Sequence, residues 1–148
     1  IGLGSVNAQP SCKNPFTVPE RREMIRRAMQ EIGVRNYEIV ELSDFEKDEE
    51  WIKEVKKAVG KFDRVWSGSK WVISVFEAQG LPIERIKEFP GLSGTKIRKC
   101  MLQGRPWMKY MPLSVRRYLK EINATNRVRK LCAGRSFGLG KTLIIQGF

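Results

Sequence analysis

Apolar residues recur along this chain with two different spacings, and segments of the two kinds alternate. A spacing of three to four residues predicts helices over residues 17–32, 49–59, 71–78, 93–102, 112–122 and 126–131. Short apolar or alternating runs predict strands over residues 1–5, 37–42, 64–66, 83–89 and 142–145. Gly33 and Gly60 stand where two of the helices should end.

This alternation of strands with helices predicts the fold class. We expect an α/β fold, a doubly wound (Rossmann-like) parallel sheet with helices on both faces. Ligands of such sheets bind beyond the carboxyl ends of the strands. The segments that follow the predicted strands are therefore the first places to search for a site: Gly4-Ser5, Asp44, Ser67-Gly68 and the residues before Ser93.

Composition adds two constraints on function. The 148 residues hold 28 Lys and Arg against 16 Asp and Glu, a formal net charge of +12, which attracts phosphate-bearing partners. The chain has 0 histidines, so imidazole acid–base chemistry and histidine-ligated metals are excluded for these residues. We therefore expect phosphate chemistry and no metal site built from protein ligands.

Cysteine usage and hydropathy bear on the compartment. Cys12, Cys100 and Cys132 are scattered and odd in number, which predicts neither a zinc site nor a disulfide framework and favours a reducing cytoplasm. We find no signal-peptide pattern at Ile1, and no apolar run approaches the roughly 20 residues of a membrane span. We expect a cytoplasmic chain without a membrane partner.

The most basic candidate site begins at Ser93. Ser93, Gly94 and Thr95 open a predicted helix, so their backbone N–H groups and hydroxyls can bind a phosphate. Arg98 lies one turn later and can grip phosphate oxygens through two hydrogen bonds. Alternatively, Ser93 simply caps a basic surface helix.

Three further segments could contribute to a nucleotide site. Thr17 and Arg21 lie at another helix start, as an anion site or as an ordinary capping box with a solvated arginine. Trp51 follows the Asp44 loop and could stack on a ligand ring or lie in the core. Ser67-Gly68 ends a short strand that we predict to be buried, where small residues admit a ligand or make a tight turn.

Read in order, these segments resemble a known family. IGLGS, NPFTVPER, the spacing from Asp44 to Trp51, WSGS and LSGTKIR are similar to the archaeal type of nicotinamide mononucleotide adenylyltransferase, in the nucleotidyltransferase superfamily. The resemblance covers about residues 1–132. It implies transfer of AMP from ATP to nicotinamide mononucleotide (NMN), with NAD and pyrophosphate as products, Mg²⁺ as cofactor and a homo-oligomeric assembly.

The resemblance also implies roles for individual residues. The ATP phosphates would be bound by Ser93, Gly94, Thr95, Arg98 and Arg21, with Thr95 and Arg98 as the catalytic pair. The nucleotide cleft would be lined by Gly4, Ser5, Thr17, Asp44, Ser67 and Gly68, with Trp51 near the nicotinamide. Ser69 replaces an asparagine of the family's pattern.

The chain departs from the family at its start. Members of the family begin with a strand and an H-x-G-H loop, whereas residues 141–148 (KTLIIQGF) look like that opening strand at the opposite end. We therefore expect a circular permutation: a domain over residues 1–133, a glycine-rich linker over 134–141 and the relocated strand over 142–148. The alternative is an unrelated tail. Without the histidine loop, we expect nucleotide binding with weak or absent turnover.

Two other functions fit the sequence less well. Another adenylyl- or cytidylyltransferase with a different phosphate acceptor would share most of these segments. A basic nucleic-acid-binding module would explain the charge near Arg116-Arg117 and over residues 127–130. These charges alternate with apolar residues at helical spacing, as on solvated helix faces, so we expect no nucleic acid partner.

Overall fold

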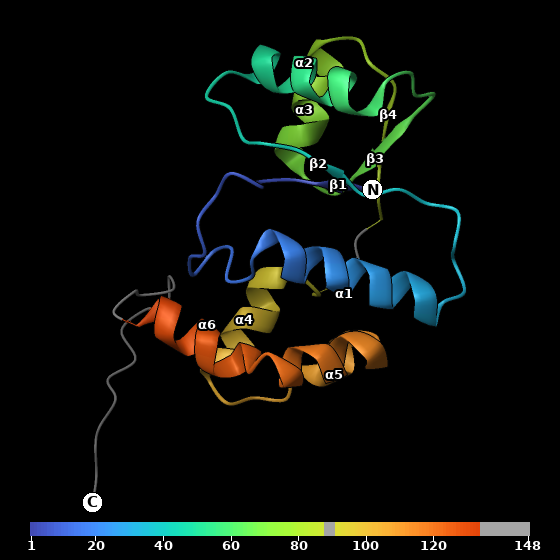
Figure 1. The fold of residues 1–148 in the computed structure, drawn as a ribbon. Coiled ribbons are helices and arrows are strands. Elements are labelled where there is room, and N and C mark those ends of the chain that lie inside the picture. The colour runs from blue at the N-terminus through green and yellow to red at the C-terminus, as the bar shows by residue number, and fades with distance from the viewer. Residues whose placement is uncertain (88–90, 134–148) are drawn as a thin grey trace, which may run out of the picture.

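The structure, a computed structural model, describes residues 1–87 and 91–133 as an α/β arrangement (Figure 1). The strands are β1 (Gly2–Leu3), β2 (Val40–Glu41), β3 (Val65–Ser67) and β4 (Ile83–Arg85). The helices are α1 (Val18–Glu31), α2 (Asp48–Val59), α3 (Lys70–Ala78), α4 (Gly94–Leu102), α5 (Leu113–Glu121) and α6 (Ala124–Cys132), with a 3₁₀ turn, η1, at Met108–Tyr110. The predicted linker and relocated strand, residues 134–148, lie outside the described part.

Local capping explains why the helices begin where the sequence predicts. Thr17 and Glu20 form the expected capping box: the Thr17 hydroxyl accepts from Glu20 N, and the Glu20 carboxylate accepts from Thr17 N. Ser69 caps α3 and Ser93 caps α4. In each case the serine hydroxyl accepts one backbone hydrogen bond, from Val72 N and from Lys96 N respectively. Gly60 ends α2 with φ 74°, a conformation that favours glycine.

The strands form two separate parallel pairs. β1 pairs with β2, with Gly2 opposite Val40, and β3 pairs with β4, with Trp66 opposite Glu84. The predicted class, parallel strands with helices, is confirmed, but the described strands are shorter and do not form one continuous sheet. The prediction that β3 is a buried strand is wrong, because the Trp66 side chain is 58% exposed.

The described residues form two hydrophobic clusters, and different helices contribute to each. One joins α2 and α3 to the strands and is made of Leu42, Trp51, Ile52, Val55, Val75 and Phe76. The other lies among α4, α5 and α6 and includes Met101, Trp107, Val115, Leu119 and Val128, with Met24 and Ala28 of α1 packed against it. In Figure 1, α2 and α3 lie on one side of the strands, and α1, α4, α5 and α6 lie on the other.

Charged side chains join α1 to α5. The Arg27 guanidinium donates to both oxygens of Glu121, at 3.2 and 3.1 Å. The Glu31 carboxylate accepts from the backbone nitrogens of Leu113 and Ser114, at 3.0 and 2.6 Å, and so caps the start of α5 from the end of α1. Hydrogen bonds from Ser114 and then Leu113 hold the pKa of the Glu31 carboxyl below its usual value.

A disulfide corrects the cysteine prediction. Cys12 and Cys132 are bonded, and their Cα atoms lie 4.8 Å apart across 120 residues of sequence, while Cys100 is free. The pairing depends on α6 packing beside the loop between β1 and α1, a contact that cysteine spacing does not reveal. The cysteine argument for a reducing compartment therefore fails, and a cytoplasmic location stays a prediction.

A helix that spans a membrane needs about 20 predominantly apolar residues. Within residues 1–87 and 91–133, none of the helices is both long and apolar enough to cross a bilayer.

Candidate nucleotide site

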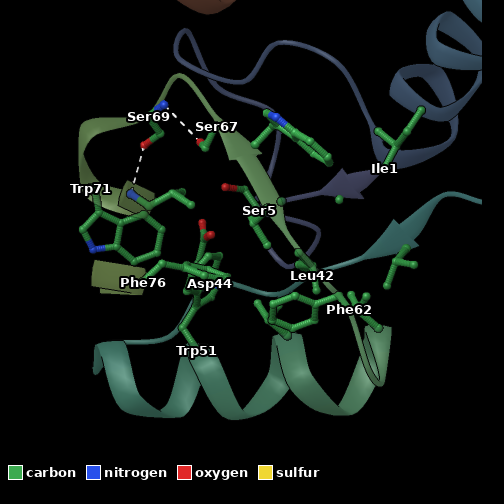
Figure 2. A pocket seen from close by; sticks show the side chains of 18 of the residues that line it. Ile1, Ser5, Leu42, Asp44, Trp51, Phe62, Ser67, Ser69, Trp71 and Phe76 are labelled. Atoms are coloured by element: carbon green, nitrogen blue, oxygen red, sulfur yellow. Dashed lines mark hydrogen bonds between the residues drawn. The ribbon is translucent and has the colours of Figure 1, made fainter. Parts of the chain in front are cut away.

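A cavity of about 550 Å³ lies between the two parallel pairs (Figure 2). Its volume is within the range of about 300–1,000 Å³ that is typical of small-molecule sites. The lining comes from both pairs and from α2 and α3: Ile1, Gly2, Gly4, Ser5, Val40, Leu42, Asp44, Trp51, Val55, Val59, Phe62, Arg64, Val65, Trp66, Ser67, Ser69, Trp71, Val72 and Phe76. The cavity thus includes the carboxyl ends of β1, β2 and β3, where the fold class predicts a ligand.

Small polar residues gather at this carboxyl end. Gly4 and Ser5 follow β1, and Ser67 ends β3. Ser67 Oγ accepts from Ser69 N at 3.1 Å, and Ser69 Oγ accepts from Val72 N at 3.3 Å (Figure 2). This turn exposes backbone and hydroxyl groups to the cavity at the start of α3, where a polar ligand can approach closely.

The Asn7 side chain holds the loops after β1 and β2 together. Its Oδ1 accepts from Asp44 N at 2.9 Å, and its Nδ2 donates to Asp44 O at 3.0 Å. The amide therefore satisfies both backbone groups of Asp44 and fixes where this residue stands on the cavity wall. An amide can do this because it carries a donor and an acceptor side by side.

Arg21 supports the same wall from α1. Its guanidinium donates to Gly4 O at 2.7 Å and to Ser5 O at 3.1 Å, and Ser5 has a left-handed backbone with φ 54°. The Arg21 Nε atom is buried and has no hydrogen-bond partner in the described part of the chain. Arg21 therefore holds the turn after β1 in place.

Aromatic rings form the wall on the side of α2 and α3. The ring centroid of Trp51 lies 4.6 Å from that of Trp71 and 6.0 Å from that of Phe76. Trp51 is only 6% exposed, so it is both a core residue and part of the cavity lining. Trp71 Nε1 donates to Asp48 Oδ1 at 3.0 Å, which fixes the orientation of the more exposed ring.

The basic segment at the start of α4 forms a separate group. Ser93 Oγ accepts from Lys96 N at 3.2 Å, and Arg98 Nη2 donates to Thr95 Oγ1 at 3.1 Å. Burial lowers the pKa of the Arg98 guanidinium, and its Nε has no partner among the described residues. A Cβ on Gly94 would lie 3.0 Å from Arg98 Nη1, so glycine leaves room for this side chain. An anion beside α4 would meet two hydroxyls, a guanidinium and free N–H groups.

The structure brings only some of the predicted site residues into the cavity. Gly4, Ser5, Asp44, Trp51 and Ser67 line it. The remaining predicted residues are not part of the lining: Thr17, Arg21, Gly68, Ser93, Gly94, Thr95 and Arg98. Arg21 reaches the wall from behind through the Gly4 and Ser5 carbonyls.

A metal ion bound by the protein itself needs several ligand side chains close together. Residues 1–87 and 91–133 contain no group of three or more Cys, Asp or Glu placed to hold a metal ion. The donors at the start of α4 are cationic side chains and hydroxyls, which suit phosphate oxygens better than a bare cation.

No family model matches the sequence. Curated relatives do match it. An enzyme of Pyrococcus furiosus is 38% identical over 136 residues, which cover 88% of this chain and 72% of the relative. Similar matches come from Pyrococcus abyssi, 39% identical over 134 residues, and Methanolobus tindarius, 33% identical over 133 residues, covering 88% of this chain and 72% and 76% of those relatives. All three are named nicotinamide-nucleotide adenylyltransferase.

This chain belongs to the nicotinamide-nucleotide adenylyltransferase family. The family resemblance inferred from IGLGS, NPFTVPER and LSGTKIR is thereby confirmed.

Solved structures support the fold of this adenylyltransferase chain. A bifunctional NMN adenylyltransferase/ADP ribose pyrophosphatase from Francisella tularensis superposes with a TM-score of 0.73 at 21% identity, covering 90% of this chain and 43% of that one. The same enzyme complexed with AMP and a manganese ion gives a TM-score of 0.74 at 22% identity, with the same coverage. This chain thus spans less than half the length of those bifunctional proteins.

Sequence reasoning missed two residues of the candidate site, Asn7, which supports the cavity wall, and Trp71, which lines the cavity. Asn7 holds Asp44, and its signal in the sequence is a polar amide two residues after the GS turn of the first predicted strand. Trp71 forms the exposed part of the aromatic wall. Its place two residues after the WSGS turn is the signal that could have indicated it.

Proposed function

We propose that this chain transfers the AMP group of ATP to the phosphate of nicotinamide mononucleotide. The observation that carries the proposal is the 33–39% identity to adenylyltransferases of that name over 88% of the chain. A phosphate oxygen of the mononucleotide bonds to the α-phosphorus of ATP. The bond from that phosphorus to the bridging oxygen breaks, so that NAD and pyrophosphate leave.

This reaction suits a site without histidine. The attacking oxygen and the leaving pyrophosphate are already anionic, so no strong base is required. Catalysis then consists of placing the two nucleotides in line and neutralising charge on the phosphates. A chain with 28 Lys and Arg and 0 His has the residues for that task.

The roles of the residues follow from what they touch. We assign the triphosphate to the start of α4, where Ser93, Gly94 and Thr95 offer donors and Arg98 carries the charge. We assign Thr95 and Arg98 as the catalytic pair because Arg98 donates a hydrogen bond to the Thr95 hydroxyl at the start of that helix. The nucleosides are assigned to the carboxyl end of the cavity, lined by Gly4, Ser5, Asp44 and Ser67 and continued by Gly68.

Three residues position this site. Arg21 holds the turn at Gly4 and Ser5, and Thr17 fixes the start of the helix that carries Arg21. Trp51 braces the ring of Trp71, against which a flat nicotinamide can stack. These residues act by placing the groups that would touch the nucleotides.

We assign the metal to the substrate. Mg²⁺ usually binds through substrate phosphates with few protein ligands, so it would arrive as Mg-ATP. The hydroxyls of Ser93 and Thr95 and the cation of Arg98 would bind phosphate oxygens of that complex. The ion would neutralise charge on the transferred phosphate.

We further propose a homo-oligomer without a nucleic acid partner, which light scattering with and without added RNA would test.

The test of function is NAD formation from ATP and NMN by the full chain. We expect slow but measurable turnover that requires a divalent cation, with pyrophosphate released in equal amount. Nicotinate mononucleotide and phosphocholine serve as alternative acceptors. Preference for phosphocholine, or ATP binding with no NAD at high enzyme concentration, would contradict the proposal.

A further inference from the structure

Two lysine side chains converge on one tyrosine ring near the start of α4. Lys96 Nζ lies 5.6 Å and Lys109 Nζ lies 5.2 Å from the centroid of the Tyr110 ring. Lys96 belongs to the first turn of α4, whereas Lys109 and Tyr110 belong to the 3₁₀ turn η1. Two separate elements thus bring two ammonium groups to one place on the surface.

The described part of the chain does not neutralise this charge. Within residues 1–87 and 91–133, no carboxylate forms a salt bridge with Lys96 or Lys109, and the glutamates that form salt bridges pair with arginines or with Lys47. A tyrosine ring attracts a cation through its electron-rich face but carries no net charge, so both positive charges remain. Both lysines are exposed. An anion that binds here would meet two cations without displacing an acid of those residues.

Lys96 also lies at the same end of α4 as the proposed triphosphate site. A Cβ on Gly91 would lie 3.1 Å from Lys96 Nζ, so this side chain turns back toward the residues before the helix. Arg98 turns back in the same way, with Nη1 3.0 Å from the position of a Cβ on Gly94. The charge of the two lysines therefore adjoins the guanidinium and hydroxyl groups that we assigned to the ATP phosphates.

We propose that Lys96 and Lys109 bind the β- and γ-phosphates of ATP and the pyrophosphate that these become. This inference rests on the proposed function. When the bond between the α-phosphorus and the bridging oxygen breaks, its electron pair stays on that oxygen, and negative charge develops on the leaving pyrophosphate. Two ammonium groups beside this anion stabilise the charge without a proton transfer. Lysine suits the task because its ammonium group is a compact point charge that binds phosphate.

Tyr110 is a positioning residue in this arrangement. Its ring attracts both ammonium groups, so it keeps two like charges near each other before the nucleotide arrives. Tyr110→Phe retains the ring face and should bind pyrophosphate as the parent does. Tyr110→Leu removes the ring face and should weaken pyrophosphate binding although both lysines are still present. Equal weakening by the two variants would contradict the role of the ring.

Isothermal titration calorimetry with pyrophosphate and, separately, with AMP tests the site on the full chain. We expect Lys96→Gln and Lys109→Gln each to raise the Kd for pyrophosphate by about three- to tenfold, as for a charge contact that is partly exposed to solvent. AMP has no β- or γ-phosphate, so its Kd should not change. Lys57→Gln removes the same charge from an exposed position on α2 and is the matched control.

Each outcome decides the proposal. Loss of pyrophosphate affinity in both lysine variants, with AMP binding and the control unchanged, supports it. This holds even where the chain forms no NAD, a result that would contradict the proposed reaction alone. Absence of pyrophosphate binding by the parent chain overturns the proposal, and so do equal affinities in Lys96→Gln, Lys109→Gln and Lys57→Gln. A single-stranded RNA that binds the parent more tightly than pyrophosphate does, and loses that affinity in both lysine variants, would assign the lysines to nucleic acid and also contradict it.

Discussion

At the scale of single residues, the site depends on side chains that hold backbone turns. Asn7 satisfies both backbone groups of Asp44, and Arg21 holds the carbonyls of Gly4 and Ser5. Thr17 was predictable as a cap because its partner, Glu20, lies three residues away. The partners of Asn7 and Arg21 lie 37 and at least 16 residues away, and no local pattern indicates them.

Arg98 provides the test at this scale. Arg98→Ala removes the charge at the start of α4, and we expect ATP binding to weaken by roughly 1.5–3 kcal/mol, the range for hydrogen bonds to charged groups. Isothermal titration calorimetry with Mg-ATP measures the change. Lys120→Ala, an exposed residue of α5, removes one positive charge elsewhere and is the matched control. Equal affinities in the two variants would remove Arg98 from the site.

At the scale of elements, the helices were predicted better than the strands. The residues that begin or end a helix lie close together in the sequence, as Thr17 and Glu20 do at the start of α1 and as Gly60 does directly after the last residue of α2. The ends of helices can therefore be predicted from the sequence. Strand pairing depends on segments that are far apart, and the described strands span only two or three residues each. Trp66 is exposed because it lines the open cavity and donates through Nε1 to Glu84 of β4 instead of packing in a hydrophobic cluster, which a run of apolar letters cannot show.

The contact between α1 and α5 predicts a pH dependence. The pKa of Glu31 is lowered by hydrogen bonds from Ser114 and Leu113, so its stabilising effect is present above the usual carboxyl range. The effect is lost as the pH falls through that lowered pKa. We expect Glu31→Gln to be less stable than the parent at pH 7 and the difference to shrink toward pH ~3.

Urea unfolding of both proteins across this pH range measures the effect. Glu46→Gln is a matched control, since Glu46 is an exposed carboxylate outside the helices. A stability difference for Glu31→Gln that stays constant with pH would show that its carboxylate does not cap α5. Glu23, whose pKa is lowered to about 2 by Arg26 and then Arg27, changes the stability of both proteins alike as the pH falls, so its effect cancels in the difference between them.

At the scale of the whole molecule, the sequence indicated the family and the fold class but not the covalent connection between distant parts. IGLGS, NPFTVPER and LSGTKIR indicated the family, and the alternation of elements indicated parallel strands with helices. The Cys12–Cys132 bond could not be inferred from three scattered cysteines, because it depends on how α6 packs. The assembly of Gly4, Asp44 and Ser67 around one cavity, by contrast, followed from their common place at strand ends.

The disulfide predicts how stability responds to reduction. Cys132→Ser, or a phosphine reductant, should lower the free energy of unfolding by about 2–5 kcal/mol, since the bond closes a loop of 120 residues. Urea unfolding measures this loss, and Cys100→Ser, which removes the free thiol, should change little. Thiol titration of the denatured, unreduced protein should find one reactive group. Three groups would contradict the bond.

The same bond has a consequence for proteolysis. A protease that cuts the backbone once, anywhere between residues 13 and 131, leaves two fragments that the sulfurs still hold in one molecule. The nicked protein would keep its mass on a non-reducing gel and separate into two bands only after reduction. Nicked chains could thus retain the packing of α6 against the loop after β1, and with it the shape of the cavity.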